Sequence, residues 1–222
     1  MIRRTNLGLS LASFMLTLWA LWHVGPFIGA VGHGPAWAYP LGVLAVLVAH
    51  EAGHMAAAWW IGLTPGWPIF FPWPLPVAAW LGWPWLPAFG TLGAWVPLPG
   101  LRRRSGDDQW LVAMSGLVAG FLVSAGLVGF GIVLSEPVSG PHVWSRLPVP
   151  WLLSVVVPKG VIWSPALVAG WLGLMLTWLN ALPLPGFDGW KLWAYWDEYS
   201  TGQKWGTVLL GGGAVCGCFP GF

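Results

Sequence analysis

The chain has 222 residues, of which 57% are hydrophobic and only 7% are charged. A soluble globular domain carries about 25% charged residues, so this composition excludes an ordinary soluble domain and indicates a protein that faces lipid. The net charge is only +2, and the basic residues form no large patch with interleaved polar residues, so nothing indicates a nucleic-acid partner.

The first apolar run, residues 7–24, is close to the length of about 20 residues that a membrane-spanning helix needs. It follows Arg3 and Arg4, which is also the order of a signal peptide, and Ala36-Trp37-Ala38 resembles a cleavage site. Because the run is long for the apolar part of a signal peptide, we predict a retained span.

A second span is predicted over residues 39–63, and the segment after it, residues 64–100, is dense in proline, glycine and tryptophan. Closely spaced prolines prevent a continuous helix. Irregular backbone is tolerated at membrane depth only where protein or a watery cavity covers it. We therefore predict a re-entrant loop or short strands that pack around a site.

Two further spans are predicted over residues 109–134 and 164–182, followed by an interfacial segment at residues 190–200. The Gly-rich run at residues 205–222 is either a fifth span or a tail. The predicted fold class is thus an all-α membrane protein with four or five transmembrane helices. Its expected parts are an N-terminal span with an outer loop (1–38), a catalytic core (39–189) and a C-terminal segment (190–222).

The distribution of basic residues predicts the orientation, because cytoplasmic loops carry an excess of Lys and Arg. Arg3 and Arg4 place the N-terminus in the cytoplasm, and the loop at residues 25–38 has no basic residue. Two spans later, Arg102–Arg104 return to the cytoplasmic side. The loop at residues 136–163 is the exception, since it carries two basic residues and lies outside.

The chemistry centres on His50, Glu51 and His54. Residues four apart on a helix share a face, so both imidazoles can bind one cation, and Glu51 can act as general base toward a water molecule there. An ionisable residue in mid-membrane costs about 2.5–3.5 kcal/mol, which favours a functional role. Haem ligation is the main alternative for membrane histidines, but it does not require Glu51.

A catalytic zinc ion has three protein ligands as a rule, and Asp188 is the best candidate for the third. It follows the fourth predicted span, beside Gly189, although Asp-Gly is also a common turn pair. Asn180, an amide within an apolar helix, must find a partner in lipid. It either hydrogen-bonds another helix or donates to a substrate or an oxyanion.

Four stretches stand out in chain order: His50-Glu51-Ala52-Gly53-His54, Phe89-Gly90-Thr91-Leu92-Gly93-Ala94, Ser115-Gly116-Leu117-Val118-Ala119-Gly120, and Asn180-Ala181-Leu182-Pro183 leading to Asp188-Gly189. Together they resemble the site-2 protease family of intramembrane zinc metalloproteases, which has such stretches in the same order. The resemblance covers about residues 49–189, some two thirds of the chain, and is more specific than the His-Glu-x-x-His stretch alone.

The resemblance implies one Zn²⁺ ion bound by His50, His54 and Asp188, with Glu51 as the catalytic base. It implies that the active site lies toward the cytoplasmic side of the bilayer. The implied substrate is a transmembrane helix of a membrane-tethered protein.

For substrate binding, the resemblance implies that Asn180 positions the substrate and that the loop with Gly90 and Gly93 lies near the substrate strand. Leu117 and Trp190 depart from the family pattern, which often has proline and glycine at these positions. The departures leave a metal carrier or chaperone without protease activity as an alternative. A structural scaffold, the third hypothesis, would bind no metal, and the oligomeric state stays open.

Overall fold

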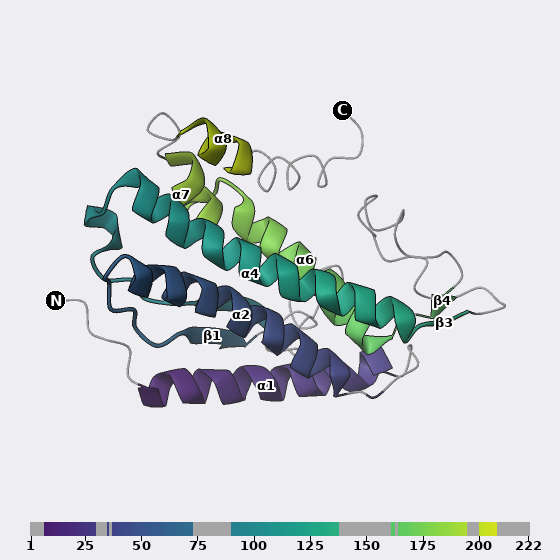
Figure 1. Ribbon diagram of the computed structural model, residues 1–222. Coiled ribbons are helices and arrows are strands. Elements are labelled where there is room, and N and C mark those ends of the chain that lie inside the picture. The colour runs from purple at the N-terminus through teal and green to yellow at the C-terminus, as the bar shows by residue number, and fades with distance from the viewer. Residues whose placement is uncertain are drawn as a thin grey trace.

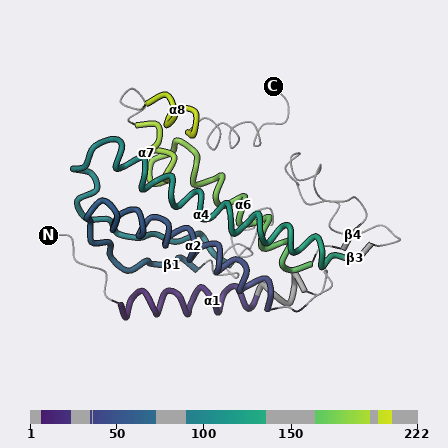
Figure 2. Tube along the Cα trace, in the orientation of Figure 1, coloured from purple at the N-terminus to yellow at the C-terminus, as the bar shows by residue number. Residues whose placement is uncertain are grey.

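The computed structural model describes residues 7–29, 35, 37–72, 90–137, 161–162, 164–194 and 200–207. Four long helices dominate this part of the chain: α1 (Leu7–Gly29), α2 (Ala38–Trp60), α4 (Gly106–Val133) and α6 (Pro165–Ala181). The shorter elements are β1 (Ile69–Pro72), β2 (Thr91–Trp95), the 3-10 helix η1 (Leu101–Arg103), β3 (Glu136–Pro137), β4 (Val161–Ile162), α7 (Asp188–Ala194) and α8 (Thr201–Thr207). Helices α2, α4 and α6 all pack on one another, with α1 alongside α2 (Figures 1 and 2).

The second predicted span ends at Trp60, three residues earlier than expected. The N–H of Gly62 donates to the Trp59 carbonyl and the N–H of Leu63 donates to the Ala58 carbonyl. This pair of hydrogen bonds is a Schellman motif, which needs a residue with positive φ after the helix. Gly62 supplies it with a φ of 76°.

Serine side chains set the beginnings of α4 and α6. The Ser105 hydroxyl accepts a hydrogen bond from the Asp108 N–H, so α4 starts three residues before the predicted position. The Ser164 hydroxyl accepts from the Leu167 N–H, and Pro165 takes the first helical position, where its missing N–H costs nothing. These caps satisfy backbone groups that an apolar surrounding would leave without partners.

Glycines allow α4 and α6 to approach closely in antiparallel orientation. A Cβ atom at Gly131 would run into the backbone of Leu167, and one at Gly170 would lie 2.6 Å from the Val128 nitrogen. Small residues of this kind let helix backbones meet where lipid gives no hydrophobic drive toward association. The contact aligns α6, whose C-terminal end leads to Asp188.

Strands β1 and β2 form an antiparallel pair, which confirms the short-strand alternative for the part of residues 64–100 that the structure describes. Residues 73–89, between the strands, lie outside that part. The Phe70 N–H on β1 donates to the Ser13 hydroxyl of α1 at 3.1 Å, so α1 covers the outer edge of β1. The paired strands β3 and β4 were not predicted from the sequence.

Within the described part of the chain, α2 and α4 are long and apolar enough to cross a membrane, by length and composition. The apolar part of α1 (Leu7–His23) and α6 are shorter. The count of four or five spans, the division into three parts and the retention of the first span therefore stay predictions. The predictions that concern Arg3, Arg4 and the tail after residue 207 lie outside the described residues.

Replacing Gly131 by alanine is expected to destabilise the protein by about 1–3 kcal/mol, because the new methyl group overpacks the contact with Leu167. Gly129→Ala is the matched control, since no atom lies within 4 Å of its Cβ position. It is expected to be neutral or stabilising by about 0.5–1 kcal/mol. Thermal unfolding in detergent, followed by circular dichroism, measures both, and equal melting temperatures would contradict the close α4–α6 contact.

Candidate metal centre

Helix α2 presents His50, Glu51 and His54 inside the protein. Their exposed fractions are 5%, 4% and 4%. The one-turn spacing puts both imidazole rings on the same face, with centroids 4.7 Å apart. Three ionisable side chains buried this close together need compensating partners, which the neighbouring helices supply.

Asp188 reaches the two histidines from the first residue of α7. It is buried, with 8% of its surface exposed. A Cβ atom at Gly189 would collide with the carbonyl oxygens of Ala181 and Leu182, so α7 begins directly against the end of α6. Only glycine fits at this position, which gives the Asp-Gly pair a packing reason beyond turn preference.

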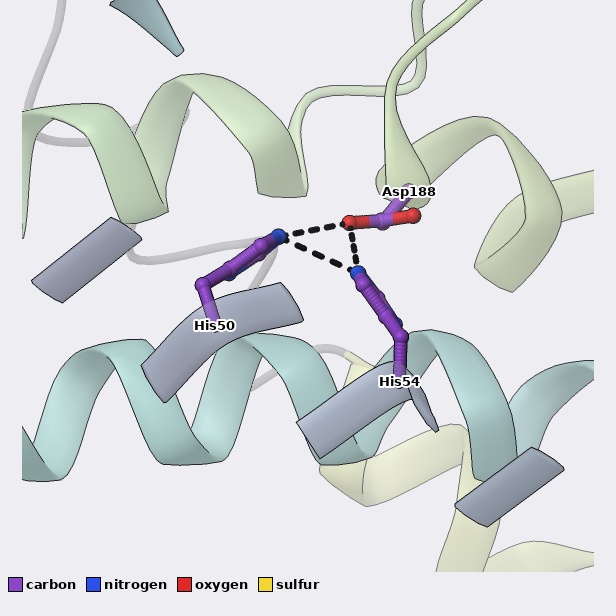
Figure 3. A group of neighbouring side chains, drawn as sticks. All are labelled: His50, His54 and Asp188. Atoms are coloured by element: carbon purple, nitrogen blue, oxygen red, sulfur yellow. Dashed lines mark hydrogen bonds and ion pairs between the residues drawn. The ribbon is translucent and has the colours of Figure 1, made fainter. Parts of the chain in front are cut away.

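The three side chains bring their ligand atoms into a nearly equilateral triangle (Figure 3). His54 Nε2 lies 2.9 Å from Asp188 Oδ2, and His50 Nε2 lies 3.1 Å from each of these two atoms. Zinc–ligand lengths of about 2.0–2.1 Å put tetrahedral ligands about 3.3–3.4 Å apart, so the triangle needs to widen by a few tenths of an ångström. The arrangement and the donor types fit a zinc ion.

A hydrogen bond of the His54 Nδ1 atom orients the ring of this histidine. His54 Nδ1 lies 2.7 Å from the Val112 carbonyl oxygen on α4, which can only accept a hydrogen bond. The Nδ1–H therefore points to Val112, which leaves Nε2 as the nitrogen that would bind a cation in the triangle. Metal-binding histidines are oriented in this way by a carbonyl or carboxylate behind them.

Asp188 is held in its ionised form. Burial by itself raises the pKa of the carboxyl group, but nearby His54, hydrogen bonds with His50 and His54, and the Lys191 ammonium hold that pKa well below its usual value. An ionised carboxylate is the form that binds a cation. The site thus offers one negative charge and two imidazole nitrogens.

Two glycines of α4 form the surface beneath the histidines. A Cβ atom at Gly116 would overlap the His54 ring, and one at Gly120 would lie 3.2 Å from His50 Nδ1. The four-residue spacing of the glycines thus matches the four-residue spacing of the histidines on the facing helix. The Gly-x-x-x-Gly pair therefore makes room for the ligands as well as for the helix.

A cavity of about 660 Å³ lies beside the three ligands and reaches Glu51. The end of the β-hairpin, Ala94 to Val96, forms part of its wall. The backbone of Val96 hydrogen-bonds the Glu51 carboxyl group, which connects the hairpin to the proposed base. A chain lying in this cavity would contact both the hairpin and the ligand group.

Asn180 also lines the cavity, near the end of α6. Its side-chain nitrogen lies 3.3 Å from His50 Nε2, which places the amide at the edge of the ligand triangle. The contact joins α6 to α2 and also lies beside the ligands, so it fits both roles predicted for Asn180, a hydrogen bond between helices and a donor at the site.

The model of peptidase family M50 matches residues 38–205, about three quarters of the chain. The chain belongs to this family. It is the site-2 protease family, as the sequence resemblance predicted. Family membership, the apolar helices and the ligand group together indicate an integral membrane metalloprotease. No curated protein and no solved structure is significantly similar to the chain.

In this M50 member, neither departure from the family pattern replaces a ligand or Glu51. Leu117 is fully buried and packs with Met114, Ala181 and other apolar residues of one core cluster. Trp190 is 49% exposed and lines the cavity. A large side chain therefore fits at position 190, where it changes the shape of the cavity wall.

The remaining site candidates lie further from the ligands. Gly90, with a φ of 82°, packs against Leu21 of α1, and neither Gly90 nor Gly93 is among the residues that line the cavity. Their role toward the substrate stays a prediction.

Two contacts at the site were not expected from the sequence, those made by the Val112 carbonyl and by the Lys191 ammonium. The Lys191 contact could have been predicted, because a residue three positions after Asp188 on a helix lies on the same face. The sequence gives no such indication for a backbone carbonyl.

Replacing Gly116 by alanine is expected to weaken zinc binding by about 10–100-fold, since the methyl group displaces the His54 ring from the triangle. Gly126→Ala on the same helix is the control, because no atom lies within 4 Å of its Cβ position. Competition with a fluorescent zinc chelator in detergent measures both affinities. Unchanged affinity in a folded Gly116→Ala protein would contradict the described packing of His54.

Proposed function

We propose that this M50 chain is a zinc endopeptidase that hydrolyses a peptide bond in a transmembrane helix of a membrane-tethered protein. The observation that carries the proposal is the buried triangle of His50, His54 and Asp188 with Glu51 and a cavity beside it. Two histidines with one carboxylate also hold iron in some oxygenases, but the family and the adjacent Glu51 favour zinc.

In the proposed reaction, a bound zinc ion supplies Lewis acidity, which polarises the substrate carbonyl and makes water more acidic. Glu51 accepts a proton from the attacking water and passes it to the leaving amine as the peptide bond breaks. His50, His54 and Asp188 hold the cation, with Val112 fixing the ring of His54. The cavity beside these groups has room for the peptide and the attacking water.

Asn180 is proposed to donate its amide N–H to the carbonyl oxygen of the scissile bond. The amide lies at the edge of the ligand triangle and faces the cavity. As water adds to the carbonyl carbon, negative charge develops on this oxygen, and a fixed donor there stabilises the transition state more than the substrate.

The substrate is proposed to lie extended along the hairpin side of the cavity. The carbonyls of a helix are occupied by its own hydrogen bonds, so the substrate helix must unwind before attack. Strand β2 leads directly into the cavity wall, which gives an unwound segment a backbone to lie against. The nearby loop with Gly90 and Gly93 belongs to the same hairpin.

Cleavage is proposed to occur toward the cytoplasmic side of the bilayer. Figure 1 shows α7, α8 and the start of α4 at the same end of the helices, and α7 begins with the ligand Asp188. Every Lys and Arg among the described residues belongs to this end: Arg102, Arg103, Arg104, Lys191 and Lys204. The concentration of basic residues favours a cytoplasmic location for it.

The change Glu51→Gln is expected to lower peptide hydrolysis by at least about 100-fold, since general acid–base catalysis contributes about 10²–10⁴ in rate. One bound zinc ion per chain should remain, because Glu51 is not a ligand. Proteomic comparison of cell membranes with wild-type and variant protein identifies new termini within transmembrane segments. Asp107→Asn, an exposed acid at the start of α4, is the control.

Equal formation of such termini by wild type and Glu51→Gln would contradict the proposed mechanism. Zinc that crosses proteoliposome membranes with no cleavage product would favour a metal carrier instead. A wild-type chain that binds no metal in elemental analysis would favour a structural scaffold.

The change Asn180→Leu is expected to lower kcat by about 10²–10³, the range for loss of one oxyanion donor. KM should change less, since the interaction strengthens only in the transition state. Kinetics on a substrate found by the proteomic comparison measure both constants. A rise in KM with unchanged kcat would assign Asn180 to substrate binding alone.

A further inference from the structure

The two oxygens of Asp188 have different partners. Oδ2 points to the histidines, at 2.9 Å from His54 Nε2 and 3.1 Å from His50 Nε2. Oδ1 accepts a hydrogen bond from the Lys191 ammonium at 2.8 Å. One oxygen of the carboxylate therefore faces the metal site, and the other is held by Lys191.

Lys191 is well placed to fix this division. It follows Asp188 by three residues on α7, so the two side chains lie on the same face of the helix. The lysine side chain is 35% exposed and lines the cavity, whereas the carboxylate is buried. An ammonium group has only donors, so it can hold Oδ1 but cannot bind a metal ion itself.

We infer that Lys191 is a positioning residue that keeps Asp188 a one-oxygen ligand of the metal. The inference rests on the metal site of the proposed function. With Oδ1 held by Lys191, only Oδ2 is available to the cation, and the ligand set stays at two nitrogens and one oxygen. Catalytic zinc sites keep a fourth position for water or substrate, and a carboxylate bound through both oxygens would crowd that position.

Metal affinity alone does not measure this role, because removing Lys191 has two opposite effects on affinity. It removes a positive charge close to the cation, which favours binding, and it frees the carboxylate to rotate, which disfavours ordered binding. The coordination number is the property that only the positioning role changes. Cobalt(II) reports it, since four-coordinate cobalt absorbs visible light more strongly than five-coordinate cobalt.

The experiment records visible spectra of the full chain in detergent with Co²⁺ in place of Zn²⁺. Lys191→Met keeps the apolar stem and removes the ammonium, and it is expected to lower the absorption severalfold as the second oxygen binds. Lys191→Arg keeps a charged donor and is expected to restore the wild-type spectrum. Lys204→Met removes a lysine that does not line the cavity and is expected to leave the spectrum unchanged.

A Lys191→Met spectrum identical to that of wild type would overturn the positioning role while leaving the metal site intact. Lys191→Leu, which also has no hydrogen-bond donor, provides the same comparison if the methionine variant does not fold. A wild-type chain without a cobalt spectrum, or an Asp188→Asn chain with an unchanged one, would instead overturn the metal site itself. The two failures are thus distinguishable.

Discussion

The close approach of α2 and α4 is the constraint on which the rest of the structure depends. At Gly53 the backbones come so near that a Cβ atom would strike the α4 main chain. One turn of α4 then lies under His54 at Gly116, and the next lies under His50 at Gly120. Because the two helices run antiparallel with matched four-residue spacings, the packing that holds the bundle together also sets the spacing and tilt of the ligands.

The polar groups of the bundle divide into two kinds. The hydroxyls of Ser124 and Thr177 donate to carbonyls four residues earlier in their own helices, so they place no demand on neighbouring helices. His54 and Asp188 instead bond to groups far away in sequence. Among the described residues, the buried side-chain hydrogen bonds between helices include those at the metal centre and one from the Ser164 hydroxyl to the Gly131 carbonyl of α4. A charge in an apolar surrounding has the most need of such fixed partners.

The ligands of the metal site could be predicted from the sequence, but most contacts of the groups around them could not. The spacing of His50, Glu51 and His54 indicates a metal site from the sequence alone. The structure places Asp188 beside the two histidines, as predicted. The Val112 carbonyl could not be foreseen, because every residue has a carbonyl and only the register of α4 against α2 selects this one. Helix limits shifted by up to three residues where Ser105 and Gly62 cap them, since capping acts at single residues and hydropathy averages over many.

Helix α1 precedes the residues that match the M50 family, yet it is bound to the wall of the cavity. Its Ser13 hydroxyl accepts the Phe70 N–H of β1, and its Leu21 packs against Gly90 at the start of β2. Without α1, the Phe70 N–H would lose its partner, and the buried Phe70 ring would lose its contact with Phe14. A hairpin whose free end reaches the Glu51 carboxyl group needs such support to hold its position. The packing of α1 therefore extends the support of the hairpin to a helix outside the residues that match the family.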